Sequence, residues 1–264
     1  MLITYGAKHR TIAYLWKLAV AMILDLDVGN TRIKWRLLEN GRLVVSDTQD
    51  TAAVAAGELL KLPEDASVAE VRIACVAGSE VLSVLNKQLF VRFSVILSVA
   101  RVSQSAGAVT CGYESPETLG VDRWLAMVAA YNQFNEGLLV IDAGSAMTMD
   151  LLGPEGQHLG GYIAPGLKLM HDALCRDTSD IEVVGSSFHE LLLPGKTTQQ
   201  AVNRGCLLMA VAAIEKLASQ YPVRIVITGG DAQCLQEALS IEVDHCPDLV
   251  LDGLAVKAVA FESI

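Results

Sequence analysis

The sequence predicts an α/β protein built from two related halves. In each half an apolar strand runs into an Asp-x-Gly turn and is followed by two more strands, over residues 22–46 and again over 138–163. Helix and strand patterns alternate after each set. The spacing also repeats, because 14 residues separate Asp27 from Gly41 and 14 separate Asp142 from Gly156. These observations indicate an internal duplication rather than a short-period repeat array.

The predicted first half, residues 22–136, opens with a meander of strands. Gly29-Asn30 interrupts the apolar segment Met22–Val28, and Asn40-Gly41 is a strong turn signal between the next two strands. The segments that follow alternate between helical and strand periodicity. The elements expected after the first strand are strands at Arg32–Leu38 and Arg42–Ser46, a helix at Thr51–Leu62, a strand at Val71–Val76, a helix at Glu80–Phe90, a strand at Phe93–Val99, and a helix from about Pro116 with Ser115 as its N-cap.

The predicted second half, residues 137–264, repeats this plan from a boundary near Gly137. The expected elements are a strand at Leu138–Ile141 that ends in Asp142–Ser145, strands reaching Leu152 and Ile163 around a turn at Gly153–Gly156, a helix at Thr198–Gln220, a strand at Val223–Ile227, a helix at Asp231–Leu239, a strand at Glu242–His245, and a helix at Asp248–Phe261. No Pro- or Gly-rich linker separates the halves, so we expect them to pack closely.

The composition is that of a globular protein. The 264 residues include 30 acidic and 20 basic side chains, which gives a formal net charge of −10, and no Lys/Arg run forms a phosphate-binding stripe. We therefore expect no nucleic-acid partner. Hydrophobic residues make up 52% of the chain, enough for a sizeable core. The six cysteines lack zinc or CxxC spacing, and we expect them to be reduced thiols.

Residues 1–21 imitate a secretory signal without matching one fully. Lys8 to Arg10 is charged, Thr11–Val20 is apolar, and Ala19-Val20-Ala21 is small. Lys17 interrupts the apolar part, and Ile12–Leu26 is too short for a membrane span of about 20 residues. We expect Met22 to be the functional start, residues 1–21 to be an extension without a site, and no membrane partner. A real signal and an added helix are the alternatives.

The turn after the first strand suits a phosphate group. Gly29 lets the backbone approach a ligand, and Asn30-Thr31 offers side-chain and amide donors. Asp27 can hold a divalent cation directly or through water, and Lys34 carries a charge suited to phosphate. For a single copy, an ordinary hairpin with Asx-type hydrogen bonds is the preferred explanation. The second copy at Asp142–Ser145 favours the phosphate interpretation.

A third element completes a known layout. The apolar strand in Ile225–Asp231 runs into Gly229-Gly230, and paired glycines let a flat base lie on the backbone. Together with the two Asp-x-Gly hairpins, this arrangement resembles the actin-like superfamily of sugar kinases, chaperone ATPases and actin. The resemblance implies two ribonuclease H-like α/β domains, residues 22–136 and 137–264, that bracket ATP between them.

Further motifs sharpen the resemblance over nearly all of Met22–Ala260. Tyr113 stands seven residues before Gly120-Val121-Asp122-Arg123, the helix pattern continues over Trp124–Ala130, and His158–Gly166 follows the second hairpin. This set resembles type III pantothenate kinase, the enzyme that phosphorylates pantothenate to 4′-phosphopantothenate at the start of coenzyme A synthesis. The Gly-x-Asp-Arg segment is much more specific than the phosphate turns.

The resemblance implies a role for each matched residue. Asp122 would be the proton acceptor, and Asp142 would bind a monovalent cation, potassium or ammonium. Ser145 stands where many relatives have Thr and keeps the hydroxyl. The implied contacts to ATP and its divalent cation, expected to be magnesium, are Asp27, Val28, Gly29, Asn30, Thr31, Arg32, Ile33, Lys34 and Ser145; those to pantothenate are Tyr113, Gly120, Val121, Asp122, Arg123 and Thr198.

The residues themselves agree in outline with these roles. Phosphoryl transfer needs a carboxylate beside the alcohol and a metal on the phosphates, which Asp122 and Asp27 can supply. The apolar stripe that starts at Val121 leaves Asp122 and Arg123 off its centre, free to face a cleft. Arg123 then offers a planar fork for the carboxylate of pantothenate. A surface Asp–Arg pair is the alternative.

Other signals are set aside. Gly195-Lys196-Thr197 lacks the first glycine of a Walker A loop, and His189-Glu190 lacks the second histidine of a zinc protease helix. His9, His158, His171 and His245 are expected to be loop or surface residues. The apolar face of Leu207–Ala218 is expected in the core or at a subunit interface.

The expected protein is thus a cytoplasmic homodimeric kinase for pantothenate. One alternative is an actin-like kinase for another small alcohol, because the ATP elements are common to the superfamily. The other is a regulatory member of the same fold without turnover. The intact Asp27, Lys34, Asp122 and Arg123 argue against a degenerate site.

Overall fold

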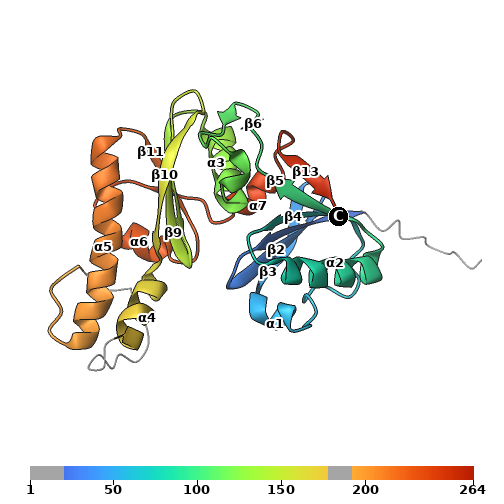
Figure 1. The fold of residues 1–264 in the computed structure, drawn as a ribbon, viewed down its shortest axis with the longest axis horizontal. Helices are drawn as coiled ribbons and strands as arrows, with labels where there is room; N and C mark the ends of the chain where they lie inside the picture. Colours follow the sequence, from blue (N-terminus) through green and yellow to red (C-terminus); the bar gives the residue numbers. More distant parts are fainter. Residues whose placement is uncertain (1–20, 178–191) are drawn as a thin grey trace, which may run out of the picture.

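The computed structural model describes residues 21–177 and 192–264. It contains two mixed β-sheets with helices between them and on their outer faces (Figure 1). Within the described ranges, no helix combines the length and apolar character needed to cross a membrane. The expectations on residues 1–20 and on His189-Glu190 lie outside the described residues.

The first sheet has the strand order β13-β5-β4-β1-β2-β3. Its meander is antiparallel, whereas β4 and β5 run parallel to β1. Helices α1 and α2 pack together, and α2 covers β4. The bounds are β1 Met22–Val28, β2 Arg32–Glu39, β3 Arg42–Asp50, α1 Thr51–Ala55, β4 Val68–Cys75, α2 Ser79–Phe93, β5 Leu97–Arg101 and β13 Ala260–Ser263.

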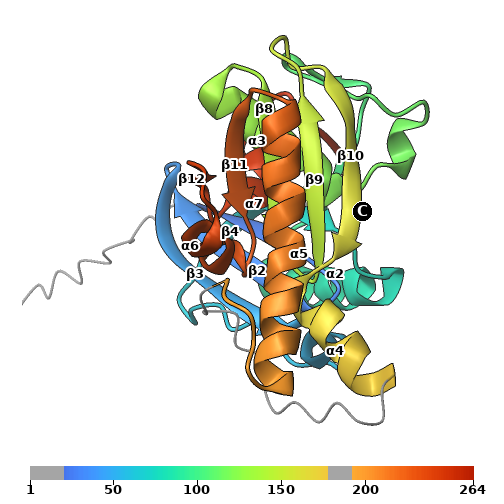
Figure 2. The ribbon, with the colours of Figure 1, turned by 90° about the vertical axis from the view of Figure 1, so that its left-hand side faces the viewer.

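The second sheet has the order β10-β9-β8-β11-β12. Helix α5 lies along one face of this sheet, with α4 and α6 near it (Figure 2). The bounds are β8 Leu138–Ala143, β9 Ala146–Leu152, β10 His158–Pro165, α4 Leu167–Asp177, α5 Thr198–Gln220, β11 Arg224–Thr228, α6 Ala232–Ala238 and β12 Asp244–His245. The remaining elements are β6 Ser105–Ala106, β7 Val109–Thr110, a 3-10 turn at Pro116–Thr118, α3 Val121–Phe134 and α7 Leu249–Leu254.

The duplication predicted from the sequence is visible in the sheet order. Numbered within each half, both sheets read 3-2-1-4-5, and in both the first strand is antiparallel to the second and parallel to the fourth. Asp27 and Asp142 occupy equivalent places, near the end of the central strand of each sheet. The expected duplicated α/β fold is confirmed.

Several elements differ from the expectations. The helix expected over Thr51–Leu62 ends at Ala55, because the chain turns at Gly57, whose φ is +103°. The helix expected from Pro116 is only a 3-10 turn there. The α-helix starts at Val121, with Gly120 rather than Ser115 in the N-cap position.

The end of the chain is also different. The helix expected over Asp248–Phe261 ends at Leu254, and residues Ala260–Ser263 form β13, which pairs antiparallel with β5. The backbone of this segment thus fills the free edge of the first sheet, and sheet pairing outweighs its helical pattern. Neither α4 nor the small β6–β7 hairpin was expected.

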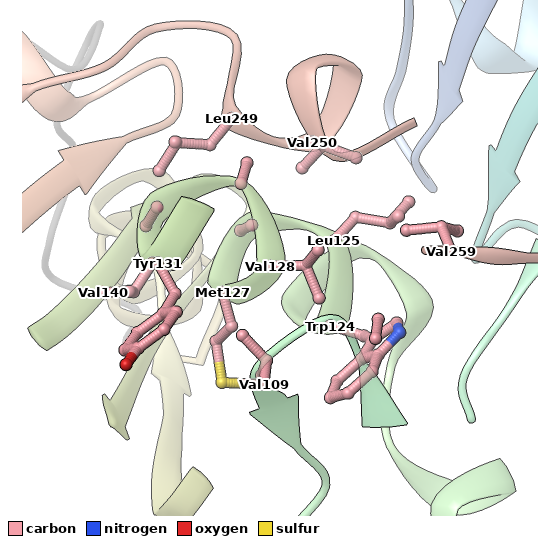
Figure 3. Close-up of a cluster of buried hydrophobic side chains, with 14 of the residues drawn as sticks. Val109, Trp124, Leu125, Met127, Val128, Tyr131, Val140, Leu249, Val250 and Val259 are labelled. Atoms are coloured by element: carbon pink, nitrogen blue, oxygen red, sulfur yellow. The ribbon is translucent and has the colours of Figure 1, made fainter. Parts of the chain in front are cut away.

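Two helices exchange partners between the halves. Helix α3 packs on β8 and β9 of the second sheet and also reaches β4, while α7 packs on β1 and β4 of the first. The two helices pack against each other at Leu125 and Gly253, where a Cβ on Gly253 would lie 2.5 Å from the Leu125 carbonyl oxygen. Their side chains form a core cluster between the sheets, including Trp124, Leu125 and Val250 (Figure 3). Burial of this shared apolar surface holds the halves together.

Candidate active site

A tight turn follows the first strand of each sheet, and the two turns meet. The Gly29 N–H donates to the carbonyl of Arg32 at 3.0 Å, and the Gly144 N–H donates to the carbonyl two residues further on at 3.1 Å. Thr31 Oγ1 and Ser145 Oγ lie 2.9 Å apart, within hydrogen-bond distance. The structure therefore brings together the two segments expected to bind ATP, although they are more than 100 residues apart in the chain.

The paired-glycine turn lies beside the second of these turns. Gly229 has a φ of +95°, and a Cβ at this position would lie 2.5 Å from both the Ala143 carbonyl oxygen and Asp142 Oδ1. Only glycine fits there. A Cβ on the next residue, Gly230, would have Arg32 Nη1 as its nearest neighbour, at 3.9 Å. Arg32 thus extends from the first half to the glycine turn of the second.

Three carboxylates face this region. Burial, followed by the charges of Asp142 and Asp122, raises the pKa of Asp27 to about 7, against a smaller opposing effect of Lys34. Burial and the charge of Asp122 raise the pKa of Asp142 to about 6. Burial raises the pKa of Asp122 as well. Because these carboxylates act on one another electrostatically, they form one acidic site that a cation would stabilise.

The acidic residues fit a cation that arrives with phosphate. Within residues 21–177 and 192–264, no three Asp, Glu, His or Cys side chains are close enough to hold a metal ion by themselves. Magnesium is commonly bound by one or two carboxylates together with substrate phosphates and water. Asp27, half-buried at the end of β1, fits that use.

The other residues expected to bind ATP differ in how far their side chains are exposed. Val28 and Ile33 are fully buried in the apolar core that the first sheet forms with α1 and α2, so their side chains anchor the turn, while Asn30 is exposed. Lys34 Nζ donates to the Pro247 carbonyl at 2.8 Å and pairs with Asp248 at 2.5 Å. The expected phosphate ligand Lys34 is therefore attached to the segment that leads into α7.

Asp122 lies in the first turn of α3. Its Oδ1 accepts a hydrogen bond from the Arg123 N–H at 2.8 Å, and a Cβ on Gly120 would lie 2.5 Å from the same oxygen. Gly120 therefore leaves room for the carboxylate, while half-buried Val121 packs against the central core cluster. A half-buried carboxylate with a raised pKa suits a proton acceptor.

Arg123 does not lie as expected. It is only 6% exposed, and its fork is occupied: Nε donates to Asp150 Oδ2 at 2.9 Å and Nη2 to Oδ1 at 2.5 Å. Nη1 donates to the Tyr113 hydroxyl at 3.0 Å. Neither the free fork nor the alternative of a surface Asp–Arg pair is correct, because a buried guanidinium requires a buried partner. The structure does bring Tyr113 and Arg123 together.

Residues 23–220 match the family model described as type III pantothenate kinase. The chain belongs to the type III pantothenate kinase family.

A relative agrees with this family assignment, and two solved structures share the fold. A type III pantothenate kinase from Chromohalobacter salexigens is 39% identical over 88% of this chain and 86% of its own length. A solved Campylobacter jejuni structure described as a Baf family transcriptional activator has a TM-score of 0.57 at 20% identity and covers 88% of this chain and 95% of its own. A Sinorhizobium meliloti structure described as a 2-dehydro-3-deoxygalactonokinase protein has a TM-score of 0.51 at 13% identity, with 88% and 97% coverage. At these identities the two structures establish the fold alone.

Two histidines were wrongly expected to be loop or surface residues. His158 is 3% exposed, and its Nε2 lies 3.0 Å from Asp150 Oδ1. Its ring stacks on Tyr113, with centroids 5.7 Å apart. His171 on α4 is also buried, next to Asp172. His158 is the first residue of β10 and His171 lies within α4, and neighbouring parts of the structure cover both side chains.

Thr198 is not brought next to the other expected substrate residues. It is exposed and begins α5, whose buried side chains belong to the cluster on one face of the second sheet. The cluster that contains α3 packs on the other face. Thr197 caps the helix by accepting a hydrogen bond from the Gln200 N–H at 3.2 Å. The role implied for Thr198 in this pantothenate kinase stays a prediction.

Sequence reasoning missed Asp150 altogether. It is 2% exposed on β9, between Met149 and Leu151, and accepts hydrogen bonds from both Arg123 and His158. A lone charge in an otherwise apolar strand was the available signal, because such a charge requires a buried partner. Its partner Arg123 is distant in the chain, so no local pattern identifies the pair.

Proposed function

We propose that this protein transfers the γ-phosphoryl group of ATP to pantothenate and forms 4′-phosphopantothenate, the first step of coenzyme A synthesis. The observation that carries the proposal is the electrostatic interaction of Asp122 with Asp27 and Asp142. The charge of Asp122 raises the pKa of both of these carboxyl groups. Family membership supplies the substrate.

In the proposed reaction, the pantothenate hydroxyl oxygen bonds to the γ-phosphorus while the bond from that phosphorus to the bridging oxygen of ADP breaks. Asp122 accepts the hydroxyl proton. Residues 27–34 and Ser145 hold ATP, and Tyr113, Gly120–Arg123 and Thr198 hold pantothenate. A magnesium ion bound with ATP would neutralise charge on the phosphates, with Asp27 as its protein ligand.

We also propose Asp142 as the ligand for a monovalent cation, potassium or ammonium. Support comes from its burial without a cationic partner strong enough to lower its pKa, which remains raised to about 6. A Cβ on Gly229 would lie 2.5 Å from Asp142 Oδ1 and a Cβ on Gly144 would lie 3.4 Å from it, so the absence of side chains at both glycines leaves room beside the carboxylate. A reaction that uses cellular ATP favours a cytoplasmic location.

A homodimer is proposed from the apolar surface of the second half. The edge strand β10, helix α4 and helix α5 expose large apolar side chains, and these are Leu159, Tyr162, Ile163, Leu169, Leu208 and Met209. Exposed apolar groups in neighbouring elements are typical of a protein interface. Leu207, next to Leu208, is buried, so the Leu207–Ala218 segment faces the core on its other side.

The test is ADP release by the purified protein with ATP, magnesium and pantothenate, with potassium or sodium as the sole monovalent cation. We expect turnover that requires pantothenate and is faster in potassium. Turnover with another alcohol but not with pantothenate would show that this other alcohol is the substrate. No turnover with any alcohol, together with specific binding to a promoter fragment, would favour a regulatory protein.

A further inference from the structure

Asp150 is the centre of a buried polar network behind the expected substrate residues. Its two carboxylate oxygens accept hydrogen bonds from Nε and Nη2 of Arg123, at 2.9 and 2.5 Å, and Oδ1 also lies 3.0 Å from His158 Nε2. Although burial opposes it, the hydrogen bonds from His158 and Arg123 lower the pKa of Asp150. Asp150 is therefore an ionised partner that fixes the guanidinium plane.

This pairing decides which donors of Arg123 remain for a ligand. The Nε and Nη2 edge is occupied by Asp150, so Arg123 cannot present that edge to a substrate carboxylate in this arrangement, and the N–H groups of Nη1 and Nη2 that face away from Asp150 are the donors left. Nη1 donates to the Tyr113 hydroxyl at 3.0 Å. Because the tyrosine oxygen accepts that bond, its own O–H is directed elsewhere and is available as a donor.

His158 contacts both Asp150 and Tyr113, the two residues that bind the Arg123 side chain. A carboxylate only accepts hydrogen bonds, so the proton of His158 lies on Nε2 toward Asp150. Its Nδ1 is buried and has no hydrogen-bond partner among the described residues. The ring stacks on Tyr113 at an interplanar angle of 14°. His158 thus contacts the carboxylate that orients Arg123 and the ring that Arg123 contacts.

Two glycines leave the space that this network needs. A Cβ on Gly161 would collide with Asp150 Oδ1 and would lie 2.7 Å from Arg123 Nη2. A Cβ on Gly112 would collide with the His158 carbonyl oxygen. Neither glycine has a positive φ, so close packing rather than backbone conformation requires them.

We propose that Asp150 and His158 are positioning residues for the pantothenate end of the site. They hold the Nε–Nη2 edge of Arg123, so that substrate meets the outer N–H groups of Nη1 and Nη2 and the hydroxyl of Tyr113 instead of that edge. This inference rests on the proposed function for the identity of the substrate, but the orientation of Arg123 can be measured without any substrate.

The kinetic test compares Asp150→Asn with the unaltered protein. Asparagine keeps the shape but places an amide donor against the donors of Arg123 or His158. We expect the KM for pantothenate to rise about ten- to hundredfold, the range that loss of a charged hydrogen bond gives. The KM for ATP should remain within about twofold, because the hydrogen bonds of Asp150 go to Arg123 and His158 rather than to residues 27–34. An unchanged KM for pantothenate would overturn the inference.

Variants of His158 separate positioning from mere stability. His158→Gln can still donate from its terminal amide toward Asp150, whereas His158→Leu cannot. We expect the leucine variant to raise the KM for pantothenate and the glutamine variant to restore most of it. Ile214→Val, in the core cluster on the other face of the second sheet, is the control that lowers the melting temperature without changing either KM.

A substrate-free measurement distinguishes failure of this inference from failure of the proposed function. In a ¹H–¹⁵N spectrum, the Arg123 Nε–H, assigned with Arg123→Lys, should be protected from exchange in the unaltered protein and lose that protection in Asp150→Asn. If the unaltered protein does not phosphorylate pantothenate, the proposed function and the substrate named here fail together, and the spectrum still decides the orientation of Arg123. A rapidly exchanging Nε–H in the unaltered protein would overturn the positioning role.

Discussion

Thr31 and Ser145 join the two phosphate turns by a hydrogen bond of 2.9 Å between their hydroxyl groups. The hydroxyls come from neighbouring, not identical, positions of the duplicated motif, because Thr31 lies two residues after Gly29 and Ser145 lies directly after Gly144. Both residues are exposed, so the bond contributes at most about 1 kcal/mol to stability. A phosphate that enters between the turns can replace it without a large energetic cost.

Removal of these hydroxyls should affect ATP more than the fold. We expect Thr31→Val and Ser145→Ala each to raise the KM for ATP by roughly tenfold, because each deletes one hydrogen bond to a charged group. A double-mutant cycle measured by urea unfolding should give a coupling energy of about 0.5–1 kcal/mol or less. A KM for ATP that is unchanged in both variants would show that the turns do not bind the nucleotide.

Asp122→Asn should remove catalysis and keep the fold. The change deletes the proton acceptor without changing shape, and we expect kcat to fall about 10²- to 10⁴-fold. The circular dichroism spectrum and melting temperature should remain near those of the unaltered protein. Glu117→Gln, the same chemical change at an exposed residue of the preceding 3-10 turn, is the control. Near-normal turnover in Asp122→Asn would remove Asp122 from the proposed role.

The raised pKa of Asp27 predicts a pH dependence of stability. Its pKa rises from 3.8 to about 7 on folding, so between these values the folded state binds more protons than the unfolded state. The free energy of unfolding should therefore decrease as the pH rises from about 4 to about 7. In Asp27→Asn this component should disappear, as measured by urea unfolding at a series of pH values. The same slope in both proteins would contradict the assignment.

Gly253→Ala should weaken the packing between α3 and α7, the two helices that exchange partners between the halves. The added Cβ would lie 2.5 Å from the Leu125 carbonyl oxygen, so backbone must move, and we expect a loss of about 1–3 kcal/mol. Activity should fall as well, because α3 carries Asp122 and α7 follows the Lys34 contact. Gly205→Ala in α5, where nothing lies within 4 Å of the new Cβ, should instead gain roughly 0.5–1 kcal/mol. Thermal and urea unfolding of both variants provide the comparison.

Local signals predicted most of the fold. Turn residues such as Asn40-Gly41 and the repeated Asp-x-Gly pattern located the strands of both meanders, and Thr198–Gln220 was found at its observed bounds. The errors occurred where a distant segment decides the local structure. Residues 260–263 form a strand only because β5 offers a free edge, and no local pattern reveals that partner.

The same distinction applies to the site. Asp27, Asp122 and Asp142 were predicted from motifs, and the structure places them where their charges interact. The surroundings of Arg123 could not be predicted, because Asp150 and His158 reach it through the pairing of β9 and β10. Residue type alone does not reveal whether a guanidinium fork is free or already occupied.

The pairing of β13 with β5 has a consequence for biosynthesis. The first sheet is otherwise made from residues 22–101, yet its edge strand β13 consists of residues 260–263, which are synthesised much later. Until then the backbone of β5 has an unpaired edge, and β1 and β4 lack the cover of α7. Domains usually fold as they emerge, N-terminal part first. Here the first sheet lacks its edge strand until residues 260–263 have emerged, and a product terminated before them would expose a strand edge able to pair with other chains.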